Sequence, residues 1–448
     1  MSTIAALLEK GRRAHLIGAG GVSMSALAEV LANRGLSVTG SDRQESEAVL
    51  KLRRLGIPVE RGESGLYVHD ADVVIRTAAA REDNPEVALA RSLGKPLLER
   101  ADAWGELMRG YERVICVAGT HGKTTTTGML THIAMESGSD PSVMMGGQLP
   151  LLGAGHRVGA SGLMIAEACE YHNSYHRFRP TAAVLLNIEA DHLDFFSGLD
   201  ELIASFRDFA RLVPPDGVII ANGDDINVRK ALDGLNVLWL GSDFRAEGLV
   251  SDRGRFAYNV VYRGTTEAGV RLKVPGMHNV QNSLAAAAAA LANGLSADAV
   301  SRGLASFTGI GRRMEYRGSV NGADIYDDYA HHPSAIAATL TAASAMGYRR
   351  VLCVFQPHTY TRTKALFKEF AAALTGFDRC YLSDIYAARE ADPGGVSSEA
   401  LAARIPGAVY TGTAEATAQT VLNDLKPGDI LLTMGAGDVY KVAELLIR

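Results

Sequence analysis

The fold of this chain is decided by the stretch Val114-Ile115-Cys116-Val117-Ala118-Gly119-Thr120-His121-Gly122-Lys123-Thr124. Its apolar beginning predicts a buried strand, and the residues from Thr124 to Thr127 open a helix. A glycine-rich turn between a strand and a helix directs backbone N–H groups and the positive end of the helix dipole at one point, where they favour an anion. The stretch therefore predicts a parallel α/β sheet with an anion site where this strand ends.

The residues after the two glycines are suited to a nucleoside triphosphate. Lys123 can bridge the β- and γ-phosphates, and the Thr124 hydroxyl can coordinate Mg²⁺. The match to the common phosphate loop is incomplete, because position 117 is valine where that pattern has its first glycine. The alternative interpretation is a structural glycine turn before a helix. We expect an ATP site that includes Gly119, Thr120, His121, Gly122, Lys123, Thr124 and Thr125.

Outward from this stretch, short apolar strands alternate with helical segments, and the alternation starts afresh twice. The first unit has a strand at His15–Gly18 and a helix at Met24–Asn33, and the last unit has strands at Asp324–Asp328 and Val351–Phe355. The Gly/Arg segment Gly309–Arg313 has the composition of a linker. This α/β pattern predicts three domains: a Rossmann-like domain over residues 1–104, a central P-loop-type ATPase sheet over 105–314, and a C-terminal Rossmann-like domain over 315–448. Near the end of the first domain the pattern assigns no element to a polar stretch, 84–100, and a helix at 101–109 spans the boundary to the second domain.

Composition excludes several classes of partner. The chain has 448 residues, a net charge of −5 and 47% hydrophobic residues. This is the composition of a globular protein without general affinity for nucleic acid or anionic membrane. The most apolar run, residues 284–292, is much shorter than the ~20 residues that cross a bilayer, and the N-terminus lacks the pattern of a signal peptide. Four widely separated cysteines form no metal-binding pair. We expect a cytoplasmic protein with no nucleic-acid partner and no membrane insertion.

Candidate metal ligands follow two further strands of the central domain. The strand at Leu163–Ala166 is followed by Glu167, and the strand at Ala183–Leu186 by a polar segment that contains His192. Ligands of parallel sheets collect beyond the carboxyl ends of the strands, and Mg²⁺ prefers carboxylate and phosphate oxygens. We expect Thr124 and Glu167 to hold one cation and His192 a second. Each residue taken alone also fits a capping or surface role, and weaker candidates are Glu170, Glu189, Asp191 and Asp194.

A second glycine-rich loop follows the first strand of the chain. Gly18-Ala19-Gly20-Gly21-Val22-Ser23 resembles a dinucleotide fingerprint, but serine stands where the third glycine would be, and Asp42 ends the next strand. Three interpretations remain: a nicotinamide site, the diphosphate of another nucleotide such as UDP, and a structural turn. A UDP site is favoured because the next domain already has a nucleotide loop. The predicted substrate-binding residues here are Gly18, Gly20, Gly21, Val22, Ser23 and Asp42.

Together these motifs resemble the Mur ligase family over essentially the whole chain. The segments that carry the resemblance are 18–24, 119–127, 167–171, 187–194, 278–282, 327–333 and 355–362. The resemblance implies ATP-dependent addition of L-alanine to the lactyl carboxylate of UDP-N-acetylmuramate through an acyl phosphate, with Mg²⁺ or Mn²⁺, in peptidoglycan biosynthesis. It also implies a monomer or weak homodimer. The alternatives are a recycling ligase that adds a murein tripeptide to the same sugar, a folate–glutamate ligase, and a non-catalytic nucleotide-binding regulator.

The resemblance also assigns roles to residues outside the two loops. It implies that Lys123, Glu167, His192 and His331 are catalytic, with His331 or His358 taking a proton from the amine. Asn279 and Asn282 match positions near the adenine, and Arg313 matches a basic position facing the nucleotide. Around the muramoyl carboxylate and the alanine the resemblance places Tyr329, His331, His358 and Arg362. An arginine fork suits the carboxylate of alanine.

Overall fold

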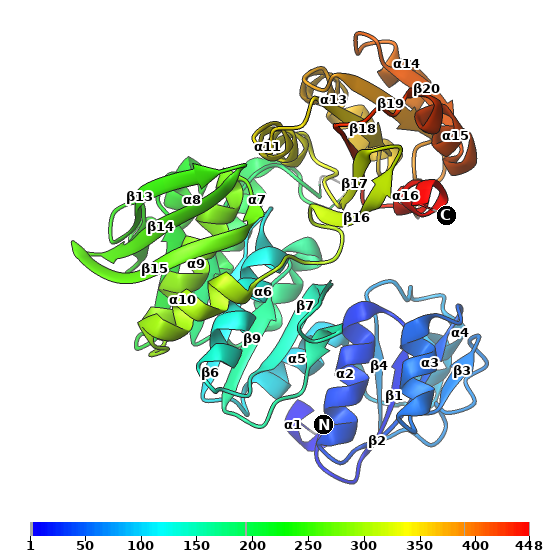
Figure 1. Ribbon diagram of the computed structural model, residues 1–448. Helices are drawn as coiled ribbons and strands as arrows, with labels where there is room; N and C mark the ends of the chain where they lie inside the picture. Colours follow the sequence, from blue (N-terminus) through cyan, green and yellow to red (C-terminus); the bar gives the residue numbers. More distant parts are fainter. Residues whose placement is uncertain (1–2, 193–194, 389, 448) are drawn as a thin grey trace.

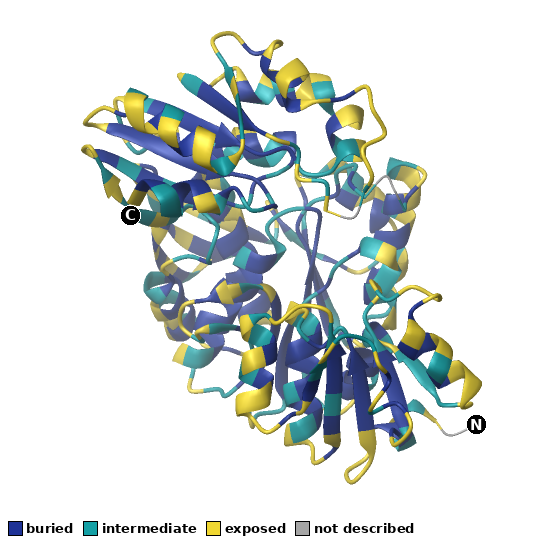
Figure 2. Ribbon diagram, turned by 90° about the vertical axis from the view of Figure 1, so that its right-hand side faces the viewer, coloured by how far each residue is buried: buried dark blue, intermediate teal, exposed yellow. Residues whose placement is uncertain are grey.

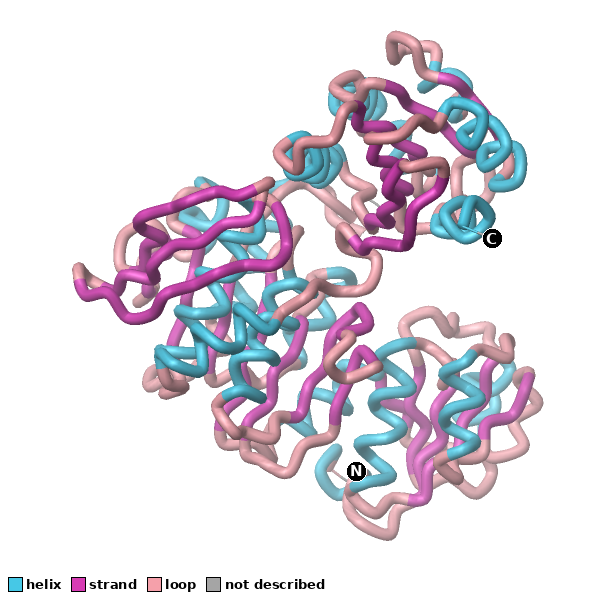
Figure 3. Tube along the Cα trace, viewed as in Figure 1, coloured by secondary structure: helices cyan, strands magenta, loops and turns pink. Residues whose placement is uncertain are grey.

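Three α/β units follow one another along the chain (Figure 1). The structure, a computed structural model, describes residues 3–192, 195–388 and 390–447. The weak candidate Asp194 lies outside these residues. Each unit is built on its own sheet, visible as three separate groups of strands in Figure 3. The predicted α/β fold class is confirmed.

The N-terminal sheet is fully parallel, in the order β3-β2-β1-β4-β5. Since β1 lies at the centre and the order reverses there, loops on both sides of the reversal open at the same edge, where nucleotides bind in such sheets. The elements are α1 (Ile4–Leu7), β1 (Arg13–Ile17), α2 (Val22–Asn33), β2 (Ser37–Asp42), α3 (Glu47–Arg54), β3 (Val59–Arg61), β4 (Val73–Arg76), α4 (Pro85–Ser92), β5 (Leu97–Glu99) and α5 (Arg100–Met108).

The polar stretch 84–100 contains a helix and a strand that the sequence pattern did not assign. Asn84 caps α4 by accepting hydrogen bonds from two backbone N–H groups of its first turn, and Pro85 occupies the first helical position. Both residues favour a helix start. The buried side of α4 is formed by Glu86, Val87 and Ala90. Because a charged residue is part of this side, apolar periodicity alone does not reveal the helix.

The central sheet has ten strands, in the order β15-β14-β13-β12-β11-β10-β6-β9-β7-β8. The strand before the nucleotide loop, β6, lies between β10 and β9, parallel to both. The strands are β6 (Arg113–Ala118), β7 (Ser142–Leu149), β8 (Ala154–Arg157), β9 (Leu163–Glu167), β10 (Ala182–Leu185), β11 (Val218–Asn222), β12 (Leu238–Leu240), β13 (Phe244–Asp252), β14 (Arg255–Tyr262) and β15 (Thr265–Pro275). The helices are α6 (Lys123–Glu136), η1 (Tyr171–Arg177), α7 (Leu199–Ala210), α8 (Ile226–Ala231), α9 (Met277–Ala292) and α10 (Ala297–Ser306).

The C-terminal sheet has the order β16-β17-β21-β18-β19-β20, and every pair except β16·β17 is parallel. Its strands are β16 (Glu315–Val320), β17 (Ala323–Asp328), β18 (Arg350–Phe355), β19 (Arg379–Ser383), β20 (Val409–Gly412) and β21 (Asp429–Met434). Its helices are α11 (Pro333–Ser344), α12 (Tyr360–Ala365), α13 (Phe367–Leu374), α14 (Ser398–Ala402), α15 (Ala414–Asp424) and α16 (Tyr440–Ile447).

Buried strands form the cores of all three units (Figure 2). Against the central sheet, α9 buries an unbroken run of six alanines, residues 285–290, whose small side chains let the helix approach the strands closely. Burial of these apolar surfaces is the main stabilising contribution. No helix of the described residues is long and apolar enough to cross a membrane.

Two junctions connect the units. Residue 104, the predicted end of the first domain, falls inside α5, and Trp104 is buried in an apolar cluster shared by the N-terminal and central units. Residues 307–314 join α10 to β16 with only a bridge between Ile310 and Arg313. The domain limits 1–104, 105–314 and 315–448 remain predictions.

Candidate active site

The nucleotide loop is held by the loop that follows the neighbouring strand β10. Thr120 N donates to Asn187 O (2.9 Å), and His121 N donates to Asn187 Oδ1 (2.7 Å). Gly122, with φ +84°, sits directly before the first residue of α6, and a Cβ there would lie 2.4 Å from Asn282 Oδ1. Only glycine combines this backbone conformation with such a close approach. The loop is therefore fixed in shape before any ligand arrives.

Lys123 makes an ion pair with a buried carboxylate. Its Nζ lies 2.9 Å from Glu170 Oε2 and also donates to the carbonyls of Gly119 and Thr120. The Glu170 side chain is only 1% exposed, and its other oxygen lies 3.8 Å from His192 Nε2. Burial opposes the charged lysine, but the Glu170 carboxylate outweighs burial and raises the pKa of Lys123 above its ordinary value. The structure thus joins two predicted catalytic residues, Lys123 and His192, through Glu170.

Glu167 and Thr124 lie on the two sides of a glycine pair in β7. Gly146 N donates to Glu167 Oε2 (2.7 Å), and a Cβ at Gly147 would lie 3.0 Å from Thr124 Cγ2. A carboxylate and a hydroxyl at this position are ligands of the kind that Mg²⁺ prefers. The arrangement fits the predicted first cation, with Glu167 at the end of β9 and Thr124 at the start of α6.

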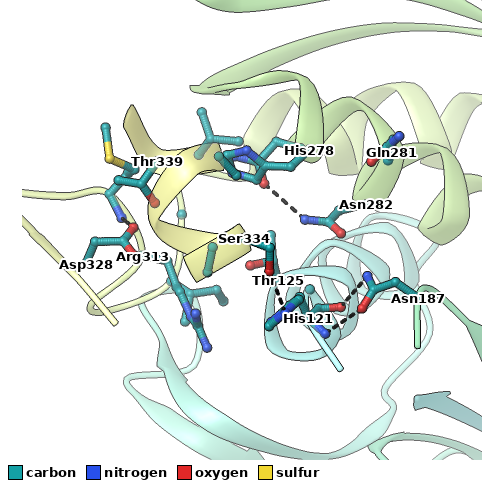
Figure 4. A pocket seen from close by; sticks show the side chains of 18 of the residues that line it. His121, Thr125, Asn187, His278, Gln281, Asn282, Arg313, Asp328, Ser334 and Thr339 are labelled. Carbon is teal, nitrogen blue, oxygen red and sulfur yellow. Dashed lines mark hydrogen bonds between the residues drawn. The ribbon is translucent and has the colours of Figure 1, made fainter. Parts of the chain in front are cut away.

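A cavity of about 220 Å³ lies beside the loop, between the central and C-terminal units. Figure 4 shows that its walls come from the nucleotide loop, from α9 and from the segment around α11. Of the predicted ATP-binding residues, it is lined by His121, Gly122, Thr125, Asn279, Asn282 and Arg313. Gly119, Thr120, Lys123 and Thr124 do not line this cavity; they form the base of the loop. Asn282 Nδ2 donates to Asn279 Oδ1 (3.3 Å), which orients both amides.

A polar cluster connects the nucleotide loop to the C-terminal unit. Ser334 Oγ, in the first turn of α11, donates to Glu189 Oε2 (2.6 Å) and lies 3.1 Å from His121 Nε2. Among the described residues, His121, Glu189 and His332 are the group of histidines and acids close enough to share a metal ion. The hydrogen bond with His121 lowers the pKa of Glu189 to about 2. Sequence reasoning missed His332 and Ser334, because nothing local in the chain shows that α11 approaches the loop.

The alanine-site candidates gather around an ion pair between units. Arg362 Nη2 lies 2.8 Å from Asp191 Oδ1, and Arg362 Nη1 lies 3.1 Å from His358 Nδ1. These three side chains and His192 line a cavity of about 540 Å³. Tyr329 and His331 do not line this cavity, but their ring centroids lie 5.3 Å apart, and the His331 ring lies 5.9 Å from the ring of His358, which does line it. All four residues that the resemblance places near alanine are therefore brought together.

The two histidines of this group are held neutral. Burial lowers the pKa of His331 well below its ordinary value and that of His358 to about 4, and the positive charge of Arg362 adds to both shifts. The pKa of Asp191 is lowered as well, which for a carboxylate favours the charged form. Although burial alone would raise the pKa of Asp191, Arg362 and His192 lower it below its usual range. The site thus presents a fixed ion pair next to neutral imidazoles.

The first glycine loop forms the edge of the N-terminal sheet. Gly18 N donates to Ser41 O (2.9 Å), and Gly20 N donates to Asp42 Oδ2 (2.8 Å), so the loop is tied to the end of β2. A cavity of about 630 Å³ lies over this edge and is lined by Gly18, Gly21 and Asp42. Gly20 does not line this cavity, but its N–H group orients Asp42.

A smaller cavity connects this edge to the central unit. It measures about 290 Å³ and is lined by Gly21, Val22 and Ser23 on one side and by Glu167 on the other. Gly21 and Thr77 line both this cavity and the larger one, so the two adjoin. The predicted sugar-nucleotide loop and the predicted metal ligand therefore face the same space.

Comparison with known proteins agrees with this three-part architecture. Family profiles described as "Mur ligase family, catalytic domain", "Mur ligase middle domain" and "Mur ligase, glutamate ligase domain" match residues 13–112, 117–290 and 312–437. The UDP-N-acetylmuramate–L-alanine ligase of Acetivibrio thermocellus is 44% identical, and the alignment covers 98% of this chain and 96% of the relative. The enzyme of the same name from Clostridium perfringens is also 44% identical, over 99% of each chain.

Solved structures show the same arrangement. The UDP-N-acetylmuramate-alanine ligase of Thermotoga maritima superposes with a TM-score of 0.81 at 26% identity, covering 97% of this chain and 98% of that one. A murein peptide ligase from Psychrobacter arcticus superposes with a TM-score of 0.73 at 25% identity, covering 98% of both chains. Since the profiles span all three sheets and the relatives align over nearly the whole length, this chain belongs to the Mur ligase family.

Proposed function

We propose that this chain is an ATP-dependent ligase that joins L-alanine to the lactyl carboxylate of UDP-N-acetylmuramate. The observation that carries the proposal is the cavity of about 290 Å³ that runs from the first glycine loop to Glu167. A sugar nucleotide bound at the N-terminal edge reaches the phosphate-transfer residues through this space. The curated relatives that align over 96% and 99% of their own length have names that state the same substrates.

The reaction has two steps. A carboxylate does not react with an amine at neutral pH, because oxide would have to leave. In the first step a carboxylate oxygen attacks the γ-phosphorus of ATP, the bond to the β,γ-bridging oxygen breaks, and ADP leaves. In the second step the amine attacks the acyl carbon, and phosphate leaves with the oxygen that came from the carboxylate. The amine loses a proton on the way.

Positioning and charge neutralisation are what the protein contributes to phosphoryl transfer. Two unit charges ~4 Å apart repel by about 4 kcal/mol at an effective dielectric of 20, so bringing the carboxylate to the γ-phosphate needs a nearby cation. Lys123 supplies one positive charge from the first turn of α6. Mg²⁺ or Mn²⁺, when bound by Thr124 and Glu167 with a second ion at His192, would supply the rest.

The C-terminal unit supplies the groups for the second step. In this proposal Arg362 holds the carboxylate of alanine as a fork. His331 and His358, whose lowered pKa values favour the neutral form at pH 7, accept the proton of the ammonium group. Tyr329 packs under Arg313, with the guanidinium 5.0 Å from the ring, and so connects the nucleotide wall to this group. We place the reaction in the cytoplasm, where ATP is available, and expect a monomer or weak homodimer.

A coupled assay for ADP tests the proposal. The purified protein receives ATP, MgCl₂, UDP-N-acetylmuramate and either L-alanine or the murein tripeptide. We expect ADP release only when the sugar nucleotide and L-alanine are both present. Release with the tripeptide instead would assign the recycling reaction, and no release in either case would leave a non-catalytic nucleotide-binding protein.

A further inference from the structure

Two imidazoles and a carboxylate form a cluster between the central unit and the C-terminal unit, apart from the predicted magnesium ligands. His121 belongs to the nucleotide loop, Glu189 to the loop after β10, and His332 directly precedes α11. Glu189 Oε2 lies 3.3 Å from His121 Nε2 and 3.5 Å from His332 Nδ1. One ligand atom from each residue lies within 4.8 Å of the other two. The cluster therefore has the dimensions of a metal site.

The separations fit a tetrahedral site for a transition metal. Zn²⁺ binds imidazole nitrogen and carboxylate oxygen at ~2.0–2.2 Å, which places neighbouring ligand atoms of a tetrahedron about 3.3–3.6 Å apart. The octahedral geometry and the ~2.1 Å bonds of Mg²⁺ would bring them to about 3.0 Å. Two nitrogen ligands also favour Zn²⁺, because Mg²⁺ prefers oxygen. Spacing and donor set thus favour the same ion.

A serine hydroxyl marks the point at which the three ligand atoms converge. Ser334 Oγ lies 2.6 Å from Glu189 Oε2. The same hydroxyl oxygen lies 2.8 Å from His332 Nδ1 and 3.1 Å from His121 Nε2. Figure 4 shows Ser334 directed at His121 from the neighbouring segment. Because one small polar atom contacts all three ligand atoms, these atoms face one common point.

The imidazole of His332 is directed at this point. Its side chain is 9% exposed, and Nδ1 faces Glu189 and Ser334. Within the described part of the chain, Nε2 of the same ring is buried without a hydrogen-bond partner. The hydrogen bonding of this buried ring is therefore confined to the side of the cluster. Burial also favours the neutral imidazole, which is the form that binds metal ions.

The backbone fixes the positions of the ligands in advance. His121 N donates to Asn187 Oδ1 (2.7 Å), and Glu189 N donates to Thr120 Oγ1 (2.9 Å). His332 is the N-cap residue of α11, and this helix also packs against α9 of the central unit. Ligands that are already held in place lose little conformational freedom when an ion binds.

We propose that this cluster binds Zn²⁺ and that the ion connects α11 to the nucleotide loop. The ion enters from the cavity of about 220 Å³, which is lined by His121, Glu189 and Ser334. On binding, it replaces the hydrogen bonds that join the ligand atoms through the Ser334 hydroxyl. Since His121 and Glu189 belong to the central unit and His332 to the C-terminal unit, the ion cross-links the two units at the wall of the nucleotide cavity. The site does not depend on the proposed reaction.

Metal titration of the full chain, without nucleotide or substrate, tests the proposal. Isothermal titration calorimetry with ZnCl₂ compares the unaltered chain with His332→Gln and with Glu189→Gln. The matched control is His156→Gln, which alters a histidine that lies 2.9 Å from a single carboxylate, that of Glu29. We expect each cluster variant to weaken the tightest Zn²⁺ site by at least about 100-fold, since losing even an outer partner of a metal ligand costs ~10- to 100-fold. His156→Gln should match the unaltered chain.

Co²⁺ provides a second measurement, because its visible absorption reports the coordination geometry. The unaltered chain should give the intense bands of four-coordinate Co²⁺, and both cluster variants should lack them. Circular dichroism checks that each variant is folded. Because the two substitutions lie in different units, a folding defect in one variant leaves the other to decide.

Three results would overturn the assignment. Equal Zn²⁺ affinity in the unaltered chain and in both cluster variants would leave the cluster as a hydrogen-bonded contact between units. Loss of the tightest site in Glu167→Gln but not in His332→Gln would place the ion at the predicted magnesium ligands. A weak, six-coordinate Co²⁺ spectrum of the unaltered chain would contradict the tetrahedral site. If Zn²⁺ bound as expected but no ADP were released with alanine, only the proposed reaction would fail.

Discussion

Lys123 has two roles that a single substitution would confound. It neutralises phosphate charge in the proposed reaction, and it compensates Glu170, whose side chain is 1% exposed. We expect Lys123→Ala to lower kcat by at least about a thousandfold, equivalent to ~4 kcal/mol of lost transition-state stabilisation. It should also lower Tm, because a buried carboxylate left unpaired costs about 3–5 kcal/mol.

The double variant Lys123→Ala/Glu170→Gln separates the two roles. It removes the uncompensated charge of the Glu170 carboxylate, so Tm should recover while turnover stays absent. The control Lys230→Ala, on the exposed face of α8, should change neither Tm nor kcat. Steady-state kinetics and differential scanning calorimetry provide the two measurements. A Lys123→Ala protein that kept most of its kcat would refute the role of this lysine in phosphoryl transfer.

Arg362 tests the proposed alanine site. In the structure its guanidinium is shared between Asp191 and His358, and it lines the cavity between the central and C-terminal units. Arg362→Lys keeps the charge but removes the fork, so we expect the KM for L-alanine to rise by about tenfold or more, with the KM for ATP little changed. Arg404→Lys, at an exposed position of the same unit, is the control. An unchanged alanine KM would remove Arg362 from the site.

At the scale of elements, α6 offers a matched pair of glycines. Gly122 precedes the helix and Gly138 follows it, with φ of +84° and +81°, but a Cβ at Gly122 would meet Asn282 at 2.4 Å, whereas Gly138 has nothing within 4 Å. Alanine at either position should cost roughly 1–2 kcal/mol of backbone strain. Only Gly122→Ala should also abolish ATP binding, measured by calorimetry. Equal ATP affinity in the two variants would contradict the close fit of loop and α9.

The contact between α6 and α10 should make stability depend on pH. Burial lowers the pKa of His132 to about 4, and its Nδ1 lies 2.8 Å from Ser306 Oγ. The imidazole of His132 takes up a proton near pH 6.5 in the unfolded chain but only near pH 4 in the folded chain. The free energy of unfolding is therefore highest above about pH 6.5 and falls as the pH drops from 6.5 to 4. His132→Gln should therefore flatten the decline of Tm between pH 6.5 and 4. The control His69→Gln, which alters an exposed histidine, should leave this decline unchanged. An equal dependence of Tm on pH in the unaltered chain and in both variants would contradict the lowered pKa of His132.

Elements with a strong local signal were predictable from the sequence, and elements defined by pairing were not. The strands at Val114–Val117 and Leu163–Ala166 are short apolar runs next to glycines or polar residues, and both appear as β6 and β9. The antiparallel strands β13, β14 and β15, which extend the central sheet, were not predicted. β15 alternates exposed and buried positions, but its place depends on contact with distant β14 rather than on its own residues.

At the scale of the whole molecule, the candidate site is assembled from all three units, which limits what the sequence could predict. The nucleotide loop was recognisable because its residues are contiguous, from Gly119 to Thr125. Arg362 contacts Asp191, which lies 171 positions away in the chain, and Ser334 contacts His121, which lies 213 positions away. No local sequence pattern predicts contacts over such separations. The residue roles inferred from the resemblance, including the metal ligands, remain predictions for the experiments above.

Formation of an acyl phosphate is the chemical step on which the three-part site depends, and isotope transfer tests it directly. UDP-N-acetylmuramate labelled with ¹⁸O in both oxygens of its lactyl carboxylate is converted with ATP, Mg²⁺ and L-alanine, and the phosphate released is analysed by mass spectrometry. If the carboxylate attacks the γ-phosphorus, each phosphate carries one ¹⁸O. Unlabelled phosphate, or label appearing in AMP, would show that the carboxylate is not activated in this way.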